Sequence, residues 1–249
     1  MPVSSWLLDH LHLQPGQTVL ELAAGPGDTG FMAAELIRPG GHLISSDGSE
    51  AMVAVARERA RALAIDNVEF KRLELEWIDQ DTASVDAIVC RWGLMLTVDP
   101  AAALHEMRRV LRPGGSLAIA VWDQAAKNPW STLPSEAMIR LGHMPPPDPD
   151  APGMYSLAAP GRLGEMLAQA GFLDVVIESI AVDRSYRDVA ELLAETGDLS
   201  RTFGVAYARL SDSQRAEVRR ETETLAAAYT KPGGTLTLPG RSLVASAGA

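Results

Sequence analysis

The chain has 249 residues, of which 47% are hydrophobic, and its formal net charge at pH 7 is −10. This length fits one large domain or a domain with an insertion, and the acidic balance argues against binding to nucleic acid or to an anionic membrane surface. The single cysteine, Cys90, excludes an internal disulfide, no apolar run reaches the roughly 18–20 residues of a membrane span, and no signal peptide is evident, so we expect a cytoplasmic protein.

Apolar strand-like segments alternate with helix-like segments through the first half of the chain. Asp99 and Pro100 have the character of a helix cap and a first helical residue, and Pro113-Gly114-Gly115 is expected to end that helix. Repeated strand–helix units of this kind indicate a parallel sheet with helices on both faces. The predicted strands are 18–23, 42–46, 67–72, 85–90 and 116–122, and the predicted helices include 29–37 and 50–63.

The second half of the chain has a less regular pattern. Residues 128–153 are rich in proline and predict a loop around a short helix over 135–141. Ser211 and Gln214 have the spacing of a capping box. The other predicted elements are helices 160–170, 185–196 and 211–229, a strand over 173–182 and a last strand within 235–247.

A glycine-rich turn follows the first predicted strand, with Gly25, Gly27 and Gly30 in the spacing G-x-G-x-x-G. Such a turn before a helix exposes backbone N–H groups that bind polar or anionic groups, although three glycines also suit an ordinary tight turn. Asp47 closes the second strand, where a carboxylate can hold the ribose hydroxyls of an adenosine cofactor. Its alternative role is to cap the next helix, for which Ser49 is better placed.

Glu21 lies four residues before the first glycine, within an apolar run. A buried carboxylate is costly unless it is paired or hydrogen-bonded, so Glu21 should contact either the amides of the turn or a cationic group of a ligand. S-adenosylmethionine carries an α-amino group and a sulfonium, whereas a nicotinamide cofactor has no cation that needs this carboxylate. Glu21 therefore favours S-adenosylmethionine over NAD.

These motifs resemble those of the class I S-adenosylmethionine-dependent methyltransferases, and more narrowly the small-molecule branch related to the ubiquinone/menaquinone biosynthesis enzymes. Residues 21–27, ELAAGPG, match the family pattern E/D-x-G-x-G-x-G, with Ala23 in place of the first glycine. Residues 47–52, DGSEAM, match D-x-S-x-x-M. Glu74-Leu75 stands where the family has an acidic–small pair that reads the adenine edge, and Asp86, RWGLM at 91–95 and VLRPGG at 110–115 complete the match.

The resemblance implies an α/β fold with a doubly wound, Rossmann-like, seven-stranded sheet whose last strand is antiparallel. It divides the chain into an S-adenosylmethionine-binding core (1–123), a cap or loop insertion (124–159), a core helix and strand six (160–182), a helical cap insertion between strands six and seven (183–232) and the last strand (233–249). The positions that match the family's binding site for S-adenosyl-L-methionine are Glu21, Ala23, Gly25, Gly27, Asp47, Gly48, Met52, Glu74, Leu75 and Arg91.

Methyl transfer from a sulfonium is an in-line displacement, which needs a positioned nucleophile and the exclusion of water, and a base only when the nucleophile is protonated. The sequence contains no catalytic motif and no metal-ligand cluster, and His143 is the one histidine we would test as a base. Trp92, Trp130 and Tyr155 predict an aromatic-lined acceptor pocket, with core packing as the alternative. We therefore expect a small, largely apolar acceptor.

Two other functions remain open. An NAD(P)-dependent oxidoreductase would share the glycine turn but gives no reason for Glu21 or Glu74-Leu75. A non-catalytic or repurposed S-adenosylmethionine binder would have the same binding residues.

The helices at 185–196 and 211–229 have apolar stripes that pack either over the carboxyl ends of the strands, as a cap, or on the outer face of the sheet.

Overall fold

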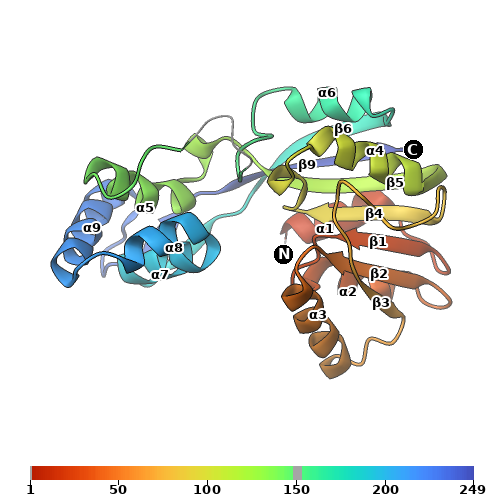
Figure 1. Cartoon of the computed structure of the whole chain (residues 1–249), viewed down its shortest axis with the longest axis horizontal. Coiled ribbons are helices and arrows are strands. Elements are labelled where there is room, and N and C mark those ends of the chain that lie inside the picture. Colours follow the sequence, from red (N-terminus) through yellow and green to blue (C-terminus); the bar gives the residue numbers. More distant parts are fainter. Residues whose placement is uncertain (1, 148–152) are drawn as a thin grey trace. The chain divides into compact units, whose positions relative to one another are not determined.

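The computed structural model describes residues 2–147 and 153–249, which form two compact units (Figure 1). The first unit comprises Met1–Trp122, Pro152–Ile180 and Ser242–Ala249. The second comprises Asp123–Ala151 and Ala181–Arg241, so it is built from two separate segments of the chain.

The first unit contains a seven-stranded sheet in the order β3-β2-β1-β4-β5-β9-β6 (Figure 1). Strands β1 to β5 pair in parallel, and β9 pairs antiparallel with β5. The predicted seven-stranded sheet with an antiparallel last strand is therefore confirmed. The strands are β1 (Thr18–Leu22), β2 (His42–Asp47), β3 (Val68–Arg72), β4 (Val85–Arg91), β5 (Leu111–Trp122), β6 (Leu173–Ala181) and β9 (Arg241–Gly248).

Burial along the strands shows which ones lie inside the sheet. Four consecutive residues are buried in β1 and in β4, as expected for central strands that helices cover on both faces. The edge strands β3 and β6 have no buried residue. The helices of this unit are α1 (Pro2–Leu11), α2 (Asp28–Leu36), α3 (Glu50–Ala62), α4 (Pro100–Val110) and α6 (Arg162–Gln169), with a short 3-10 helix, η1 (Leu94–Leu96).

The transition from α4 to β5 differs from the prediction. Asp99 caps α4 as expected, because its carboxylate accepts hydrogen bonds from the amides of Ala101 and Ala102. The helix ends at Val110, before the Pro-Gly-Gly sequence that was expected to end it, and β5 already begins at Leu111, which pairs with Val85. A shift in the β4–β5 register after Val85 accommodates the extra residues.

The second unit, as far as the structure describes it, combines helices with a small antiparallel sheet. Helices α5, α7 and α9 contact one another, and α8 packs on α7. The strands β7 (Arg184–Tyr186) and β8 (Leu236–Leu238) form the sheet. The helices are α5 (Pro129–Arg140), α7 (Val189–Leu199), α8 (Arg201–Ala208) and α9 (Asp212–Leu225), with the 3-10 helices η2 (Ala125–Lys127) and η3 (Ala227–Tyr229).

Several predictions for this region are wrong. Helix α5 begins at Pro129 rather than at residue 135, because a proline in the first turn of a helix needs no N–H partner. Helix α5 therefore replaces the first half of the loop predicted over 128–153, of which residues 148–152 lie outside the described residues. Residues 185 and 186 belong to β7, and α7 begins only after Asp188, whose carboxylate accepts a hydrogen bond from the Glu191 amide.

Two further differences concern the end of the chain. The range predicted to contain the last strand does contain most of β9, but it also contains the unpredicted strand β8, and residues 233–241 belong to the second unit. Helix α8 was not predicted. The capping box of Ser211 and Gln214 at the start of α9 is confirmed.

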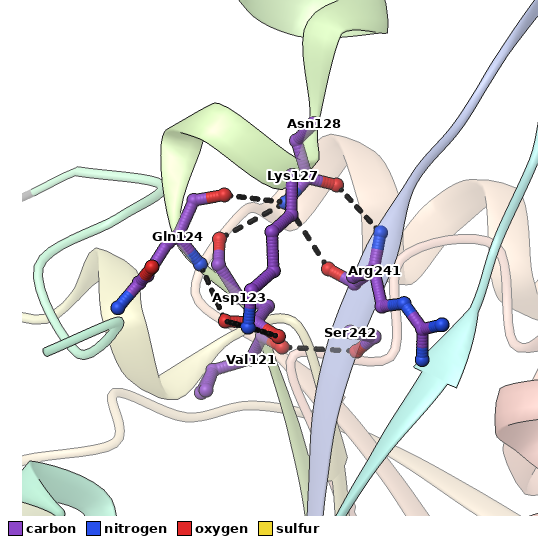
Figure 2. Close-up of polar contacts among 7 residues, drawn as sticks. All are labelled: Val121, Asp123, Gln124, Lys127, Asn128, Arg241 and Ser242. Atoms are coloured by element: carbon purple, nitrogen blue, oxygen red, sulfur yellow. Dashed lines mark hydrogen bonds and ion pairs between the residues drawn. The ribbon is translucent and has the colours of Figure 1, made fainter. Parts of the chain in front are cut away.

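Asn128 holds the two segments of the second unit together (Figure 2). Its side chain is fully buried, and its Nδ2 donates to the carbonyls of Asp123, Gln124 and Arg241 at 2.9, 3.2 and 3.2 Å. Its Oδ1 accepts hydrogen bonds from the Arg241 amide at 2.9 Å and from Trp130 Nε1 at 3.1 Å. Asn128 therefore satisfies both backbone groups of the residue that begins β9.

We predict that Asn128→Asp lowers the free energy of unfolding by about 3–5 kcal/mol, because a buried carboxylate oxygen would face three carbonyl oxygens where Nδ2 now donates. Urea denaturation followed by tryptophan fluorescence measures this loss. The control is Ser131→Ala, which removes one hydrogen bond to the Asn128 carbonyl and should cost about 1 kcal/mol. Equal losses in the two variants would contradict the role assigned to Asn128.

Candidate functional site

The candidate site lies in the first unit, where the loops that follow β1, β2, β3 and β4 come together. The Gly25 amide contacts Asp47, the Glu74 carboxylate lies against Gly48, and Ala23 lies against Gly93. In open parallel sheets, the carboxyl ends of the strands are the usual place for ligands.

Glu21 fixes the start of α2 to the neighbouring strands β1 and β2. Its side chain is only 3% exposed, and its carboxylate accepts hydrogen bonds from the Gly30 amide at 2.6 Å and from the Ser45 hydroxyl at 2.9 Å. Position 30 must be glycine, because a Cβ there would collide with this carboxylate. One buried group thus joins β1, β2 and the first turn of α2.

The structure shows one of the two contacts expected for Glu21. Its oxygens bind an amide of the helix that follows the turn and a hydroxyl of β2, and almost none of the side chain reaches the surface. The contact with the glycine loop is therefore observed, and a direct contact of Glu21 with a cationic ligand group stays a prediction. In the structure, Glu21 shapes the glycine loop.

Burial raises the pKa of Glu21 from 4.5 to about 7, although hydrogen bonds from Ser45 and Gly30 and the charge of Arg91 oppose this shift. Because the folded-state pKa exceeds the unfolded value, the folded chain binds this proton more tightly between about pH 4.5 and 7. The stabilisation is complete below this window and is lost as the pH rises through it, by up to about 3 kcal/mol.

We predict that Glu21→Gln removes this part of the pH dependence. Glutamine keeps an acceptor for the Gly30 amide and a donor for the Ser45 hydroxyl, but it cannot titrate. The unfolding free energy of the parent, minus that of the variant, should therefore fall as the pH rises from 4.5 to 7. Chemical denaturation at a series of pH values measures this difference, and a constant difference would refute the raised pKa.

The glycine loop leaves room for a ligand, but the N–H groups of Gly25 and Gly27 already donate hydrogen bonds within the protein. The Gly25 amide donates to the Asp47 carboxylate at 2.9 Å, and the Gly27 amide donates to the Ala24 carbonyl at 3.0 Å. These two amides are therefore engaged within the protein, contrary to the expectation that they await a ligand. A Cβ at Gly25 would meet no atom within 4 Å, so this side of the loop is open and a ligand can approach the backbone.

Ala23, which replaces the first glycine of the family pattern, is accommodated by a glycine on another loop. Its φ of 52° is left-handed, a conformation that costs alanine roughly 1–2 kcal/mol. A Cβ at Gly93 would collide with the Ala23 methyl group, so the absence of a side chain at Gly93 makes room for that methyl. The methyl group expected beside the cofactor therefore packs against the turn after β4.

Asp47 connects the glycine loop to the turn after β2. One carboxylate oxygen accepts from the Gly25 amide, and the other accepts from the Ser49 amide at 2.8 Å. Ser49 is the N-cap residue of α3, but its side chain makes no capping hydrogen bond. Each carboxylate oxygen can accept a second hydrogen bond, so the half-buried Asp47 keeps the capacity to bind hydroxyl groups.

Glu74 and Leu75 occupy the neighbouring position after β3. The Glu74 side chain is 62% exposed, and its Oε2 lies 3.0 Å from the point that a Cβ at Gly48 would occupy. The Leu75 side chain is buried, with its Cδ2 3.7 Å from the corresponding point at Gly93. Glu74 and Leu75, the pair predicted to read the adenine edge, therefore lie next to the turn that carries Asp47. Met52, the other predicted residue of this region, is partly exposed in the first turn of α3.

Arg91 and Trp92 form the end of β4. Arg91 Nη2 lies 3.4 Å from the carboxylate of Asp28, in the first turn of α2, and the guanidinium carbon lies 4.8 Å from the centroid of the Trp92 ring. Trp92 has a φ of 62°, a strained conformation for an aromatic residue, of the kind that gathers at functional sites. Its ring stacks on Trp122 at 4.5 Å, and its Nε1 donates to the Ser242 hydroxyl.

The three aromatic residues predicted for the acceptor pocket fall in different units. Trp92 and the half-buried Tyr155 belong to the first unit, and Trp130 belongs to the second. Trp130 is 3% exposed, its Nε1 binds Asn128, and the guanidinium carbon of Arg184 lies 3.9 Å from its ring centroid. Trp130 is thus a core residue of the second unit, as the alternative of core packing proposed.

Sequence reasoning missed Ser45, Gly93 and Asp28 as parts of this site. The serine pair at 45 and 46 interrupts an apolar strand, which is a signal that could have identified the partner of Glu21. His143, the candidate base, has a buried Nε2 with no partner among the described residues, and its catalytic role stays a prediction.

Two searches over residues 2–147 and 153–249 gave negative results. No group of three or more histidine, cysteine, aspartate or glutamate side chains there could hold a metal ion. No helix of this part of the chain has the length and apolar character that crossing a membrane requires.

Comparisons with known proteins identify the class. Residues 13–171 match a family model described as a methyltransferase domain, so the chain belongs to this family. It is similar to the demethylmenaquinone methyltransferase of Clavibacter sepedonicus, with 38% identity over 104 residues, which cover 42% of this chain and 40% of that protein. The resemblance to the methyltransferase family is thus confirmed, and residues 13–171 form a methyltransferase domain.

Solved structures show the same fold. Haemonchus contortus phosphoethanolamine N-methyltransferase 2 in complex with S-adenosyl-L-methionine has a TM-score of 0.59 and 18% identity, covering 98% of this chain and 51% of that one. The [4+2]-cyclase SpnF also has a TM-score of 0.59, with 16% identity and coverage of 99% and 79%. For three curated relatives, the matched region spans between 30% and 59% of their own length.

Proposed function

We propose that this chain transfers a methyl group from S-adenosylmethionine to a small, largely apolar acceptor. The observation that carries the proposal is the convergence of Asp47 and Glu74 with the open side of Gly25 at one edge of the sheet. At this position a ligand has space beside the backbone of Gly25, and two carboxylates can accept hydrogen bonds from an adenosine.

Each residue has a distinct proposed role in holding the cofactor. Asp47 accepts hydrogen bonds from the ribose hydroxyls, and Glu74 accepts one from the exocyclic amine of adenine. The Leu75 amide donates to a ring nitrogen. When bound, S-adenosylmethionine supplies an activated methyl group on a good leaving group, so the protein needs mainly to position the acceptor and to exclude water.

The acceptor side rests on the aromatic residues at the ends of β4 and β5. The partly exposed Trp92 provides the apolar surface, and it is held by stacking on the buried Trp122 and by its hydrogen bond to Ser242. The chain enters the second unit directly after Trp122, the last residue of β5, and again at Ala181, the last residue of β6. The two predicted cap insertions, 124–159 and 183–232, therefore begin next to the carboxyl ends of these strands. In the first unit, we assign contacts with the acceptor to Trp92 and Tyr155.

We predict that Asp47→Ala weakens S-adenosylmethionine and S-adenosylhomocysteine to the same degree, because the two ligands have the same ribose. Each hydrogen bond to a charged group contributes roughly 1.5–3 kcal/mol, which corresponds to a loss of about tenfold to several hundredfold in affinity. Isothermal titration calorimetry measures both ligands. Asp9→Ala, which removes an exposed carboxylate of α1, is the matched control and should bind as the parent does.

Titration of the parent chain with NADH separates the proposal from an oxidoreductase. Binding of S-adenosylhomocysteine without binding of NADH supports it, and the reverse result would overturn it. Consumption of S-adenosylmethionine in a screen of phenols, quinols, terpenoids and polyketides then tests transfer. Tight binding with no consumption over the whole screen would instead favour a binder that does not transfer methyl groups.

A further inference from the structure

The second unit contains an open cavity of about 360 Å³ formed by α7, α8 and α9. Its volume lies within the range of roughly 300–1,000 Å³ typical of small-molecule sites. Every residue that lines it belongs to the second unit, whereas all the proposed cofactor residues belong to the first. The cavity therefore is a site separate from the one proposed for the methyl donor.

Small residues leave this cavity empty. Ala190 and Ala194 lie one turn apart on the same face of α7, and Ala216 lines the cavity from α9. The two alanines of α7 are exposed, whereas Leu193 between them is buried and forms an apolar floor. A larger side chain at position 190, 194 or 216 would occupy the space, so the three alanine methyl groups define an accessible apolar surface.

A close contact between α7 and α8 fixes the geometry of this region. A Cβ at Gly204 would lie 2.6 Å from the carbonyl oxygen of Gly197, so the two helices approach each other with no side chain between them. Ser200 separates the helices and caps α8 through a hydrogen bond from the Phe203 amide. Because this turn is short and tightly packed, the cavity walls are held by rigid elements.

Arg215 and Tyr207 line the cavity and contact each other. Arg215 donates to the Ala208 carbonyl at 2.9 Å and to the Tyr207 carbonyl at 3.4 Å, which are at the end of α8. Its guanidinium carbon lies 5.8 Å from the centroid of the Tyr207 ring, and that ring stacks on Phe203 at 5.5 Å with an angle of 13°. The guanidinium and the two rings therefore support one another, which suits contact with a flat ligand.

The charge of the lining is the reverse of that of the chain. Arg215 and Arg219 both line the cavity, and no acidic residue does, in a protein with a net charge of −10. Their carboxylate partners lie outside the lining: Asp212 is 3.8 Å from Arg215 and fully exposed, and Glu223 is 3.0 Å from Arg219. An anionic group that enters the cavity therefore faces two guanidinium groups, whose carboxylate partners are residues outside the lining.

We propose that this cavity binds a small aromatic or alicyclic carboxylate. The apolar body of the ligand lies on the alanine methyl groups, Leu193 and the Tyr207 ring, and its carboxylate faces Arg215 and Arg219. The proposal is independent of cofactor binding, because it concerns a different ligand and a different unit from the proposed cofactor residues.

Calorimetry of the full chain with three matched probes tests the proposal: 2-naphthoate, the neutral 2-naphthamide and the cationic 2-naphthylmethylammonium. We expect saturable binding of 2-naphthoate, binding of the amide weaker by about tenfold, and no detectable binding of the cation, because charge-assisted hydrogen bonds to arginine are lost in turn. No saturable binding of 2-naphthoate, or equal binding of the cation, would overturn the proposal.

Variants locate the binding. Ala194→Phe should fill the cavity and weaken 2-naphthoate by at least about tenfold, whereas Ala228→Phe, at an exposed position of η3 outside the lining, should leave it unchanged. Arg219→Gln provides a second test, because it should weaken 2-naphthoate toward the affinity of 2-naphthamide without changing the amide. Parent-like affinity for 2-naphthoate in both Ala194→Phe and Arg219→Gln would refute the site. Binding of S-adenosylhomocysteine, measured on each variant, reports on the proposed function separately.

Discussion

The buried carboxylate of Glu21 is the interaction on which the site depends. It ties β1 to β2 through Ser45 and to the first turn of α2 through Gly30, so the path of the glycine loop between these elements is set inside the core. Burial leaves the carboxyl with a raised pKa, and the two hydrogen bonds compensate only part of that cost. The burial of this carboxyl costs free energy, and it fixes the geometry of the glycine loop.

The loop shaped in this way contributes space, and the neighbouring loops contribute the polar groups. Gly25 and Gly27 have their amides bonded within the protein, while Asp47 and Glu74 come from the turns after β2 and β3. The Ala23–Gly93 contact shows the same division, because a glycine lost from one loop is compensated by a glycine on another. The site therefore belongs to the edge of the sheet as a whole, in agreement with the position of ligand sites in open α/β sheets.

Local signals in the sequence predicted most of the first unit, and long-range contacts limited the rest. The Asp99–Pro100 cap and the Ser211–Gln214 capping box are local patterns, and both are present in the structure. Strand β7 exists only because residues 184–186 pair with 236–238, about fifty positions away, which no local pattern reveals. Glu21 was correctly singled out as unusual, but its partner Ser45 lies on a neighbouring strand, so the sequence could not distinguish an internal bond from a ligand contact.

Hydrogen exchange of backbone amides, with and without S-adenosylhomocysteine, tests most directly whether the loop fixed by Glu21 is the cofactor site. We expect added protection in residues 22–30, 47–49 and 74–77, because these segments meet at one edge of the sheet, and no added protection from NADH. Protection by S-adenosylhomocysteine that falls outside these three segments, or equal protection of them by NADH, would contradict this assignment.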